Sequence, residues 1–131
     1  MTKHWTPIKI IKYSLVYFVL LFCLVFVILA LRPITSLHMS HCISTSGIVQ
    51  SIIAHEGSKD INIRIDDEGR YYINRGLELG LTEAGLKNKI LGEEIIIHYA
   101  DQWTPLDPNG LGRHVSRVSY GNEIIFNKII E

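Results

Sequence analysis

The sequence predicts a small, mainly β domain with one short helix, preceded by a single transmembrane helix. Residues 13–31 form an uncharged, apolar run of nineteen residues. From residue 47 onward, apolar residues recur mainly at every second position, which is typical of strands, and one segment near residue 86 changes to a helical period. These patterns divide the chain into a basic tail, a transmembrane helix, a linker and a β domain: residues 1–12, 13–31, 32–46 and 47–131.

The apolar run has the length of a transmembrane helix. At about 1.5 Å per residue, its nineteen residues span roughly 28 Å, close to the ~30 Å hydrocarbon core of a bilayer. A cleaved signal peptide would have a shorter apolar core and a cleavage site flanked by small residues. The sequence around Ala30, Ser36 and Ser40 offers no such site. We therefore interpret the run as an uncleaved anchor.

The net charge of zero conceals two oppositely charged parts. Residues 1–36 carry four basic side chains and no acidic one, whereas residues 37–131 carry nine basic and thirteen acidic side chains, a net of −4. Three lysines precede the apolar run and only Arg32 follows it closely. The positive-inside rule then predicts an inner-membrane protein with a cytoplasmic N-terminus and a periplasmic domain. The acidic domain also argues against nucleic-acid binding, which relies on Lys and Arg.

The two cysteines cannot form a disulfide framework. Cys23 lies in the middle of the apolar run, out of reach of a partner outside the bilayer. Cys42 is therefore unpaired within one chain, and it is either a free thiol or a link between chains.

The first half of the domain is predicted to form three strands. Residues 47–54 are a strand candidate, and a polar turn follows them. Residues 60–65 alternate cleanly, with isoleucines on one face. Residues 67–69 form a hairpin turn in which the glycine supplies the backbone freedom, and residues 70–75 form the return strand.

A short helix is expected next. Thr82 is its N-cap, Glu83 lies in its first turn and Gly92 ends it. Its apolar face comprises Leu86, Ile90 and Leu91.

The chain then returns to strands, expected at residues 93–100, 113–120 and 123–130. A long irregular loop, residues 101–112, joins the first two, and a Gly121–Asn122 turn joins the last two. Alternation breaks around Val115 and Val118, which predicts a β-bulge.

This β-β-β-α-β-β order is similar to that of an OB-fold, a small Greek-key barrel with a helix between its third and fourth strands. Clean one-sided alternation at residues 60–65 fits a barrel wall with a filled interior. An SH3-like barrel and an open sheet crossed by a helix are the alternatives.

A basic tail, one anchor and an OB-like barrel also resemble the layout of the haem chaperone of cytochrome c maturation. That family attaches haem through a His and a Tyr four residues later. None of the six histidines here is followed by Tyr at that spacing. The resemblance covers the layout without the motif, and we expect no bound cofactor.

The densest cluster of soft metal ligands lies in the linker: His38, Met39, His41 and Cys42. Imidazole, thioether and thiolate groups suit Cu(I) or Zn(II). Their spacing matches no standard zinc pattern. The alternative interpretation is a soluble juxtamembrane linker without a metal, and we favour it.

A second candidate is the loop at residues 101–112, whose apolar residues are costly to leave in water: Trp103, Pro105, Leu106, Pro108 and Leu111. One hypothesis makes it a contact loop anchored by Trp103, because Trp is enriched at interface hot spots. The other, which we favour, has Trp103 and Leu106 fold back to plug the barrel end.

Tyr71 and Tyr72 with Arg70 and Arg75 could form an aromatic-basic surface that stacks nucleotides, but the acidic domain argues against it. We favour one tyrosine in the core and the other shielding it, and Tyr72 is retained as a candidate binding residue.

No spacing in the sequence indicates a catalytic set. His114 and Ser116 share a strand face, but no exposed nucleophile turn accompanies them. We therefore expect no enzyme but a tethered, non-catalytic binding or assembly module for envelope proteins. Metal or cofactor handling by the His38–Cys42 cluster is the competing function. An envelope-localised inhibitor or immunity-type protein is a third, which the sequence neither supports nor contradicts.

Overall fold

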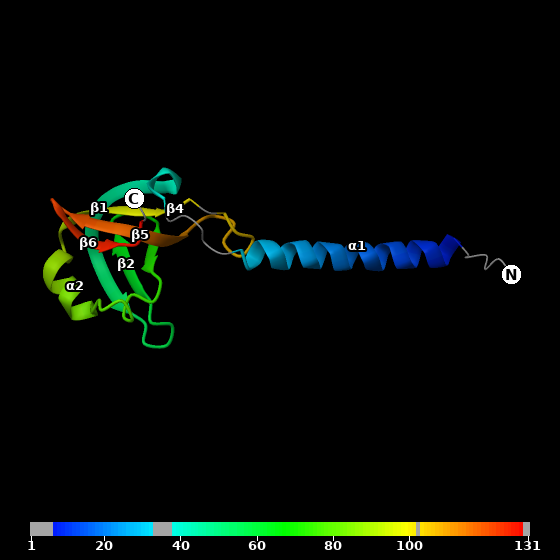
Figure 1. The fold of residues 1–131 in the computed structure, drawn as a ribbon, viewed down its shortest axis with the longest axis horizontal. Coiled ribbons are helices and arrows are strands. Elements are labelled where there is room, and N and C mark those ends of the chain that lie inside the picture. The colour runs from blue at the N-terminus through cyan, green and yellow to red at the C-terminus, as the bar shows by residue number, and fades with distance from the viewer. Residues whose placement is uncertain (1–6, 33–37, 102, 130–131) are drawn as a thin grey trace. The chain divides into compact units, whose positions relative to one another are not determined.

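The computed structural model describes residues 7–32, 38–101 and 103–129. Its first element is α1 (Pro7–Ala30), a helix of 24 residues drawn in blue in Figure 1. Proline is favoured at the first helical position because its missing N–H would have no partner there. Within α1, Ile10–Ala30 form a stretch of 21 residues that is long and apolar enough to cross a membrane. The predicted apolar span therefore forms one continuous helix, which begins six residues earlier than expected.

In the described part of the chain after α1, six strands and one α-helix form a small barrel domain (Figure 1). The elements, in chain order, are the 3₁₀ turn η1 (Met39–His41), β1 (Cys42–Ala54), β2 (Ile61–Ile65), β3 (Arg70–Ile73), α2 (Glu83–Ile90), β4 (Glu94–Ala100), β5 (Gly112–Tyr120) and β6 (Glu123–Asn127).

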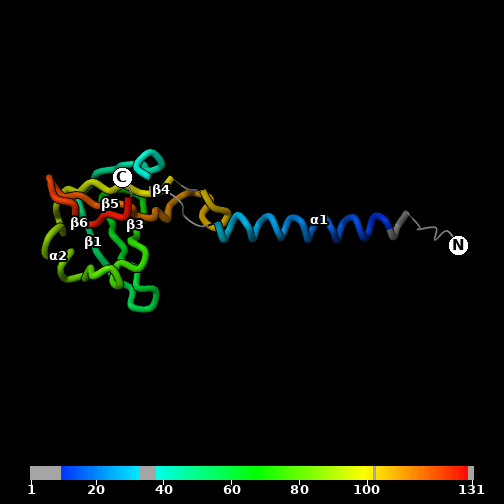
Figure 2. The backbone as a smooth tube through the Cα atoms, in the orientation of Figure 1, coloured from blue at the N-terminus to red at the C-terminus, as the bar shows by residue number. Residues whose placement is uncertain are grey.

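The strands of the described chain close into a five-stranded barrel, to which β6 is added beside β5. β1 takes part in two sides of the barrel: residues 42–48 pair with β4, and residues 49–54 pair with β2. β2 pairs with β3, and β4 pairs with β5. A parallel ladder between β3 and β5 completes the ring. Figure 2 traces the chain from β3 through α2 to β4. The predicted OB-like barrel is confirmed, and the closed ring excludes the open-sheet alternative.

The barrel interior is filled mainly by isoleucine and valine. β2 shows the cause, because Ile61, Ile63 and Ile65 are buried while Asn62 and Arg64 between them are exposed. β-branched side chains fit such a pleated, half-buried wall well. The buried residues of the core cluster are Val49, Ile52, Ile61, Ile63, Ile65, Tyr71, Ile73, Leu86, Ile90, Ile95, Ile97, Val115, Val118 and Phe126.

The helix α2 matches the sequence expectation closely. The hydroxyl oxygen of Thr82 caps it by accepting a hydrogen bond from the backbone N–H of Gly85 at 3.1 Å. Leu86 and Ile90 are buried as expected. The expectation that Leu91 belongs to the buried face is wrong, because the helix ends at Ile90 and Leu91 is an exposed C-cap residue. The carboxylate of Glu83 accepts a hydrogen bond from the backbone N–H of Ala54 at 2.7 Å, which ties the helix to the end of β1.

The first strand is longer than its apolar pattern indicates. β1 begins at Cys42, five residues inside the predicted linker, and residues 42–46 pair with β4. These residues are mainly Ser, Thr and Cys, so their alternation carries no hydrophobic signal. Backbone pairing with β4 rather than side-chain burial places them in the sheet.

The predicted bulge is present on β5. His98 and Tyr99 of β4 are consecutive, but they pair with Arg117 and Val115, so Ser116 is the extra residue. β6 ends at Asn127, earlier than expected, although Ile129 is still buried. Residue 130, the end of the predicted strand, lies outside the described residues.

Candidate functional site

The structure does not gather the linker cluster into a metal site. His38, Met39 and His41 are exposed at η1, and Cys42 is half-buried at the start of β1. The thiol of Cys42 donates to the carbonyl oxygen of His38 at 3.6 Å. Within the described ranges, no three His, Cys, Asp or Glu side chains are grouped so that they could hold a metal ion. The geometry therefore gives the metal hypothesis no support.

The loop between β4 and β5 has a fixed base and an exposed tip. The carboxylate of Asp107 accepts hydrogen bonds from the backbone N–H groups of Leu111 at 3.2 Å and Gly112 at 2.5 Å. The carbonyl oxygen of Leu111 accepts from the backbone N–H of Arg70 at 2.9 Å, which ties the loop to β3. Trp103 is 60% exposed and Leu106 is 70% exposed. The expectation that Trp103 folds back to plug the barrel end is therefore wrong, while Pro105 and Leu111 are half-buried.

A different set of side chains occupies the position where β3 meets β5. Tyr71 is fully buried, and its hydroxyl donates to the carboxylate of Asp67 at 2.5 Å. Arg113 donates to the same carboxylate at 3.2 Å and also to the Tyr71 hydroxyl. Its guanidinium lies 5.2 Å from the ring centroid of Tyr71 and 4.9 Å from that of Tyr99. We call Asp67, Tyr71, Tyr99 and Arg113 the seam cluster.

The seam cluster also accounts for the glycine at position 69 and for the raised pKa of Tyr71. A Cβ at Gly69 would lie 2.5 Å from the Arg113 guanidinium and 2.8 Å from the Tyr71 hydroxyl, so only glycine fits here without displacement. Burial, aided by the hydrogen bond to Asp67, raises the pKa of Tyr71 to about 12. The hydroxyl is therefore neutral at ordinary pH, and we assign the cluster a structural role in closing the barrel.

The outer face of β1, β2 and β3 carries two rows of side chains that cross the strands. Ser51 pairs with Arg64 across β1 and β2. Continuing the β2–β3 register by one residue places Arg70 opposite Arg64. The second row comprises Ile53, Asn62, Tyr72 and His114.

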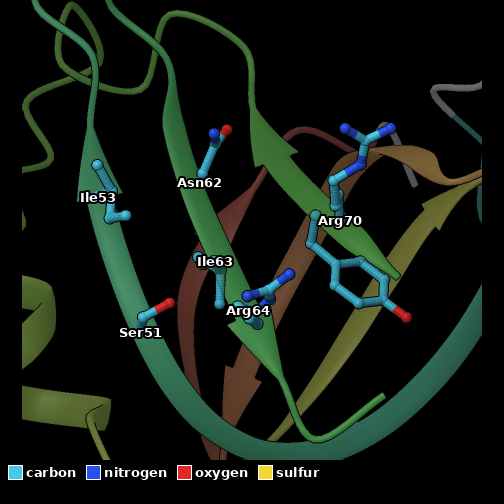
Figure 3. A pocket seen from close by; sticks show the side chains of 7 residues that line it. Ser51, Ile53, Asn62, Ile63, Arg64 and Arg70 are labelled. Atoms are coloured by element: carbon cyan, nitrogen blue, oxygen red, sulfur yellow. The ribbon is translucent and has the colours of Figure 1, made fainter. Parts of the chain in front are cut away.

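A hollow of about 190 Å³ opens between these rows (Figure 3). Figure 3 shows Ser51 and Ile53 on β1, Asn62, Ile63 and Arg64 on β2, and Arg70 on β3. The lining residues are Ser51, Ile53, Asn62, Ile63, Arg64, Arg70 and Tyr71. The hollow thus combines two cations with a hydroxyl, an amide and an apolar wall.

Tyr72 lies beside this hollow without lining it. The ring of Tyr72 is half-buried and meets the ring of His114 edge-on at 5.5 Å. His114 is only 7% exposed, and burial lowers its pKa, which favours the neutral imidazole. Ser116 is buried as well. The prediction that one tyrosine belongs to the core is confirmed by Tyr71.

Comparison with protein-family models, with curated proteins and with solved structures gives no match. The class of the protein therefore comes from its own features: an OB-like barrel that follows a helix able to span a membrane.

The Arg64–Arg70 pair was missed at the level of sequence. The signal was available, because the two residues are equally distant from Asp67 at the centre of the predicted hairpin turn. A hairpin that pairs symmetrically about this turn must place them opposite each other.

Proposed function

We propose that this protein is a non-catalytic binding or assembly module, anchored in the inner membrane with its N-terminus in the cytoplasm and its barrel in the periplasm, where it holds another envelope protein. The single observation that carries the proposal is the loop between β4 and β5. It presents Trp103 and Leu106 to solvent from a base that Asp107 holds in place.

A fixed base with an exposed apolar tip suits protein contact. Trp103 and Leu106 contribute little to the barrel core, since both are mostly exposed. Burying a side chain such as Leu against a partner stabilises a complex by about 1.5–3 kcal/mol. A preformed loop also loses less conformational entropy on binding than a mobile one. These features favour the contact hypothesis over the plug.

The proposed location is supported by charge and length. The apolar part of α1 is long enough to span a bilayer, and the basic residues of the first 36 positions outnumber the acidic ones by four to none. A reporter that is active only outside the cytoplasm, fused after Glu131, tests the orientation. Activity of this reporter is expected. Activity of a second reporter, which functions only in the cytosol, would overturn the proposed topology.

A crosslinking experiment tests the partner. A photoreactive amino acid replaces Asn109, an exposed loop residue, in the full chain in native membranes. We expect a discrete crosslinked product that Trp103→Ala and Leu106→Ala reduce by roughly tenfold or more, since each removes a large apolar contact. The matched control is Leu79→Ala, because Leu79 is 57% exposed and lies outside the loop. Absence of a crosslink, or a crosslink that Trp103→Ala leaves unchanged, would contradict the proposal.

A further inference from the structure

We infer that the hollow on the outer face of β1, β2 and β3 binds a carboxylate side chain of an acidic segment in the protein partner, held between Arg64 and Arg70. This inference rests on the proposed function, because it specifies the chemistry of the same partner. It uses a surface separate from the loop that carries Trp103.

The first reason is an unneutralised pair of like charges. Arg64 and Arg70 are exposed and directly opposite each other across β2 and β3. Like charges in this position destabilise a sheet. Within the described residues, neither arginine has an ion pair or a side-chain hydrogen bond. Other basic side chains of the barrel do have carboxylate partners: Lys59, Arg75, Lys87, Lys89 and Arg113.

The second reason is that the two hairpin aspartates beside the pair are engaged elsewhere. The carboxylate of Asp66 accepts from the backbone N–H of Ile48 at 2.9 Å. Asp67 accepts from the backbone N–H of Gly69, and it belongs to the seam cluster. These carboxylates therefore stabilise the turn and the barrel seam, and they leave the two guanidinium groups available to an external anion.

The shape of the hollow selects a small anionic group. Its volume of about 190 Å³ is below the ~300–1,000 Å³ of sites that enclose whole small molecules. A single side chain fits such a volume. Ile53, which is exposed, provides an apolar wall for its methylene groups, and Ser51 offers a hydroxyl group. Asn62 offers an amide group, whose nitrogen also hydrogen-bonds to the ring of His55 at 2.9 Å. Guanidinium groups match the planar geometry of a carboxylate.

Charge favours a protein carboxylate over a phosphate-rich surface. Residues 37–131 carry a net charge of −4, and Glu68 is exposed in the adjoining hairpin. A singly charged carboxylate meets less repulsion here than a doubly charged phosphate. Recognition of an anionic bilayer also requires about 4–8 clustered basic residues, whereas this hollow has two.

The test uses the full chain in nanodiscs of phosphatidylcholine. The probe is the blocked peptide acetyl-Gly-Ile-Glu-Ile-Gly-amide, and its counterpart carries Gln in place of Glu. The side-chain Nε–Hε signals of the arginines are followed by NMR during titration. We expect the Glu peptide to shift the signals of Arg64 and Arg70, and the Gln peptide to bind at least about tenfold more weakly.

Variants make the test specific. Arg64→Gln and Arg70→Gln should each weaken binding of the Glu peptide by about tenfold. Arg75→Gln should leave it unchanged, because Arg75 is an exposed arginine that pairs with Glu78 outside the hollow. Both replaced arginines are exposed, and a cooperative thermal unfolding transition shows that each variant is folded.

Two results would overturn the inference. One is equal binding of the Glu and Gln peptides. The other is an equal shift of the Arg64 and Arg70 signals in nanodiscs that contain phosphatidylglycerol and no peptide, which would identify a lipid phosphate as the ligand. Failure of the peptide test while the loop crosslink remains would reject this inference alone. Loss of the loop crosslink would reject the proposed function.

Discussion

The guanidinium of Arg113 lies 4.9 Å from the ring centroid of Tyr99, on the neighbouring strand β4. The same group lies 5.2 Å from the ring centroid of Tyr71 on β3. One side chain of β5 therefore connects both of its neighbours in the barrel. Edge-on packing of the two tyrosine rings at 5.6 Å completes the arrangement.

We predict that Arg113→Ala lowers the free energy of unfolding of the barrel by about 2–4 kcal/mol, since it removes partly buried cation–π contacts and charged hydrogen bonds. Thermal unfolding of the full chain in detergent, followed by the near-ultraviolet circular dichroism of the tyrosines, measures the change. Arg75→Ala is the control and should change stability by less than about 0.5 kcal/mol, because its ion pair is exposed. Equal effects of the two substitutions on the free energy of unfolding would show that the contacts of Arg113 do not stabilise the barrel.

The stability of the barrel should fall as the pH rises from about 10 to about 12. The pKa of Tyr71 is raised to about 12 by burial and by the Asp67 hydrogen bond, whereas an unfolded tyrosine titrates at 10.0. Between these values the unfolded chain loses a proton that the folded chain keeps, so deprotonation favours unfolding. Two pKa units correspond to about 2–3 kcal/mol.

The pH dependence is measured by denaturant unfolding between pH 8 and pH 12. In Tyr71→Phe the group is absent, so that variant should show a shallower decline over the same range. Parallel curves for the two proteins would show that Tyr71 does not hold its proton as the geometry implies.

Two glycine substitutions should behave oppositely. Gly69→Ala places a Cβ against the Arg113 guanidinium and the Tyr71 hydroxyl, so we expect a loss of about 1–3 kcal/mol. Gly57→Ala meets no atom within 4 Å. It should be neutral or raise stability by up to about 1 kcal/mol, because alanine reduces the freedom of the unfolded chain. Thermal unfolding of both variants measures the two changes in stability. An unchanged stability of Gly69→Ala would show that the seam cluster can rearrange to accommodate the added Cβ.

Arg64→Gln should stabilise the isolated protein by about 0.2–1 kcal/mol, because it removes a like charge directly opposite Arg70. Arg70→Gln should have a similar effect, and the double variant should gain less than the sum of the two. A thermal unfolding series measures these differences. A large loss of stability in either single variant would show that the arginines stabilise the fold and are not free to bind an anion.

The order of the elements could be predicted from the sequence because each one depends on local patterns. The alternation of Ile61, Ile63 and Ile65 identifies a barrel wall, and Thr82 with Gly92 delimits α2. The start of β1 at Cys42 could not be predicted, since its Ser- and Thr-rich residues enter the sheet through backbone pairing.

The candidate site was harder to predict because it depends on pairing between distant segments. Tyr71 and Arg113 meet through a parallel ladder that no local pattern specifies. Trp103 was expected to plug the barrel end because it is large and apolar, but its side chain is 60% exposed. The position of Arg64 opposite Arg70 follows from the symmetry of the hairpin alone, so it could have been predicted from the sequence.

The parallel ladder between β3 and β5 also has a consequence for biogenesis. Its residues, such as Tyr71 and Arg113, are 42 positions apart in the chain. The ribosome must therefore synthesise almost the whole domain before the ring can form, and loop closure over such separations slows folding. In that interval the isoleucine-rich strands have unpaired edges, which attract other chains. A nascent chain of this kind would depend on chaperones until its fifth strand arrives.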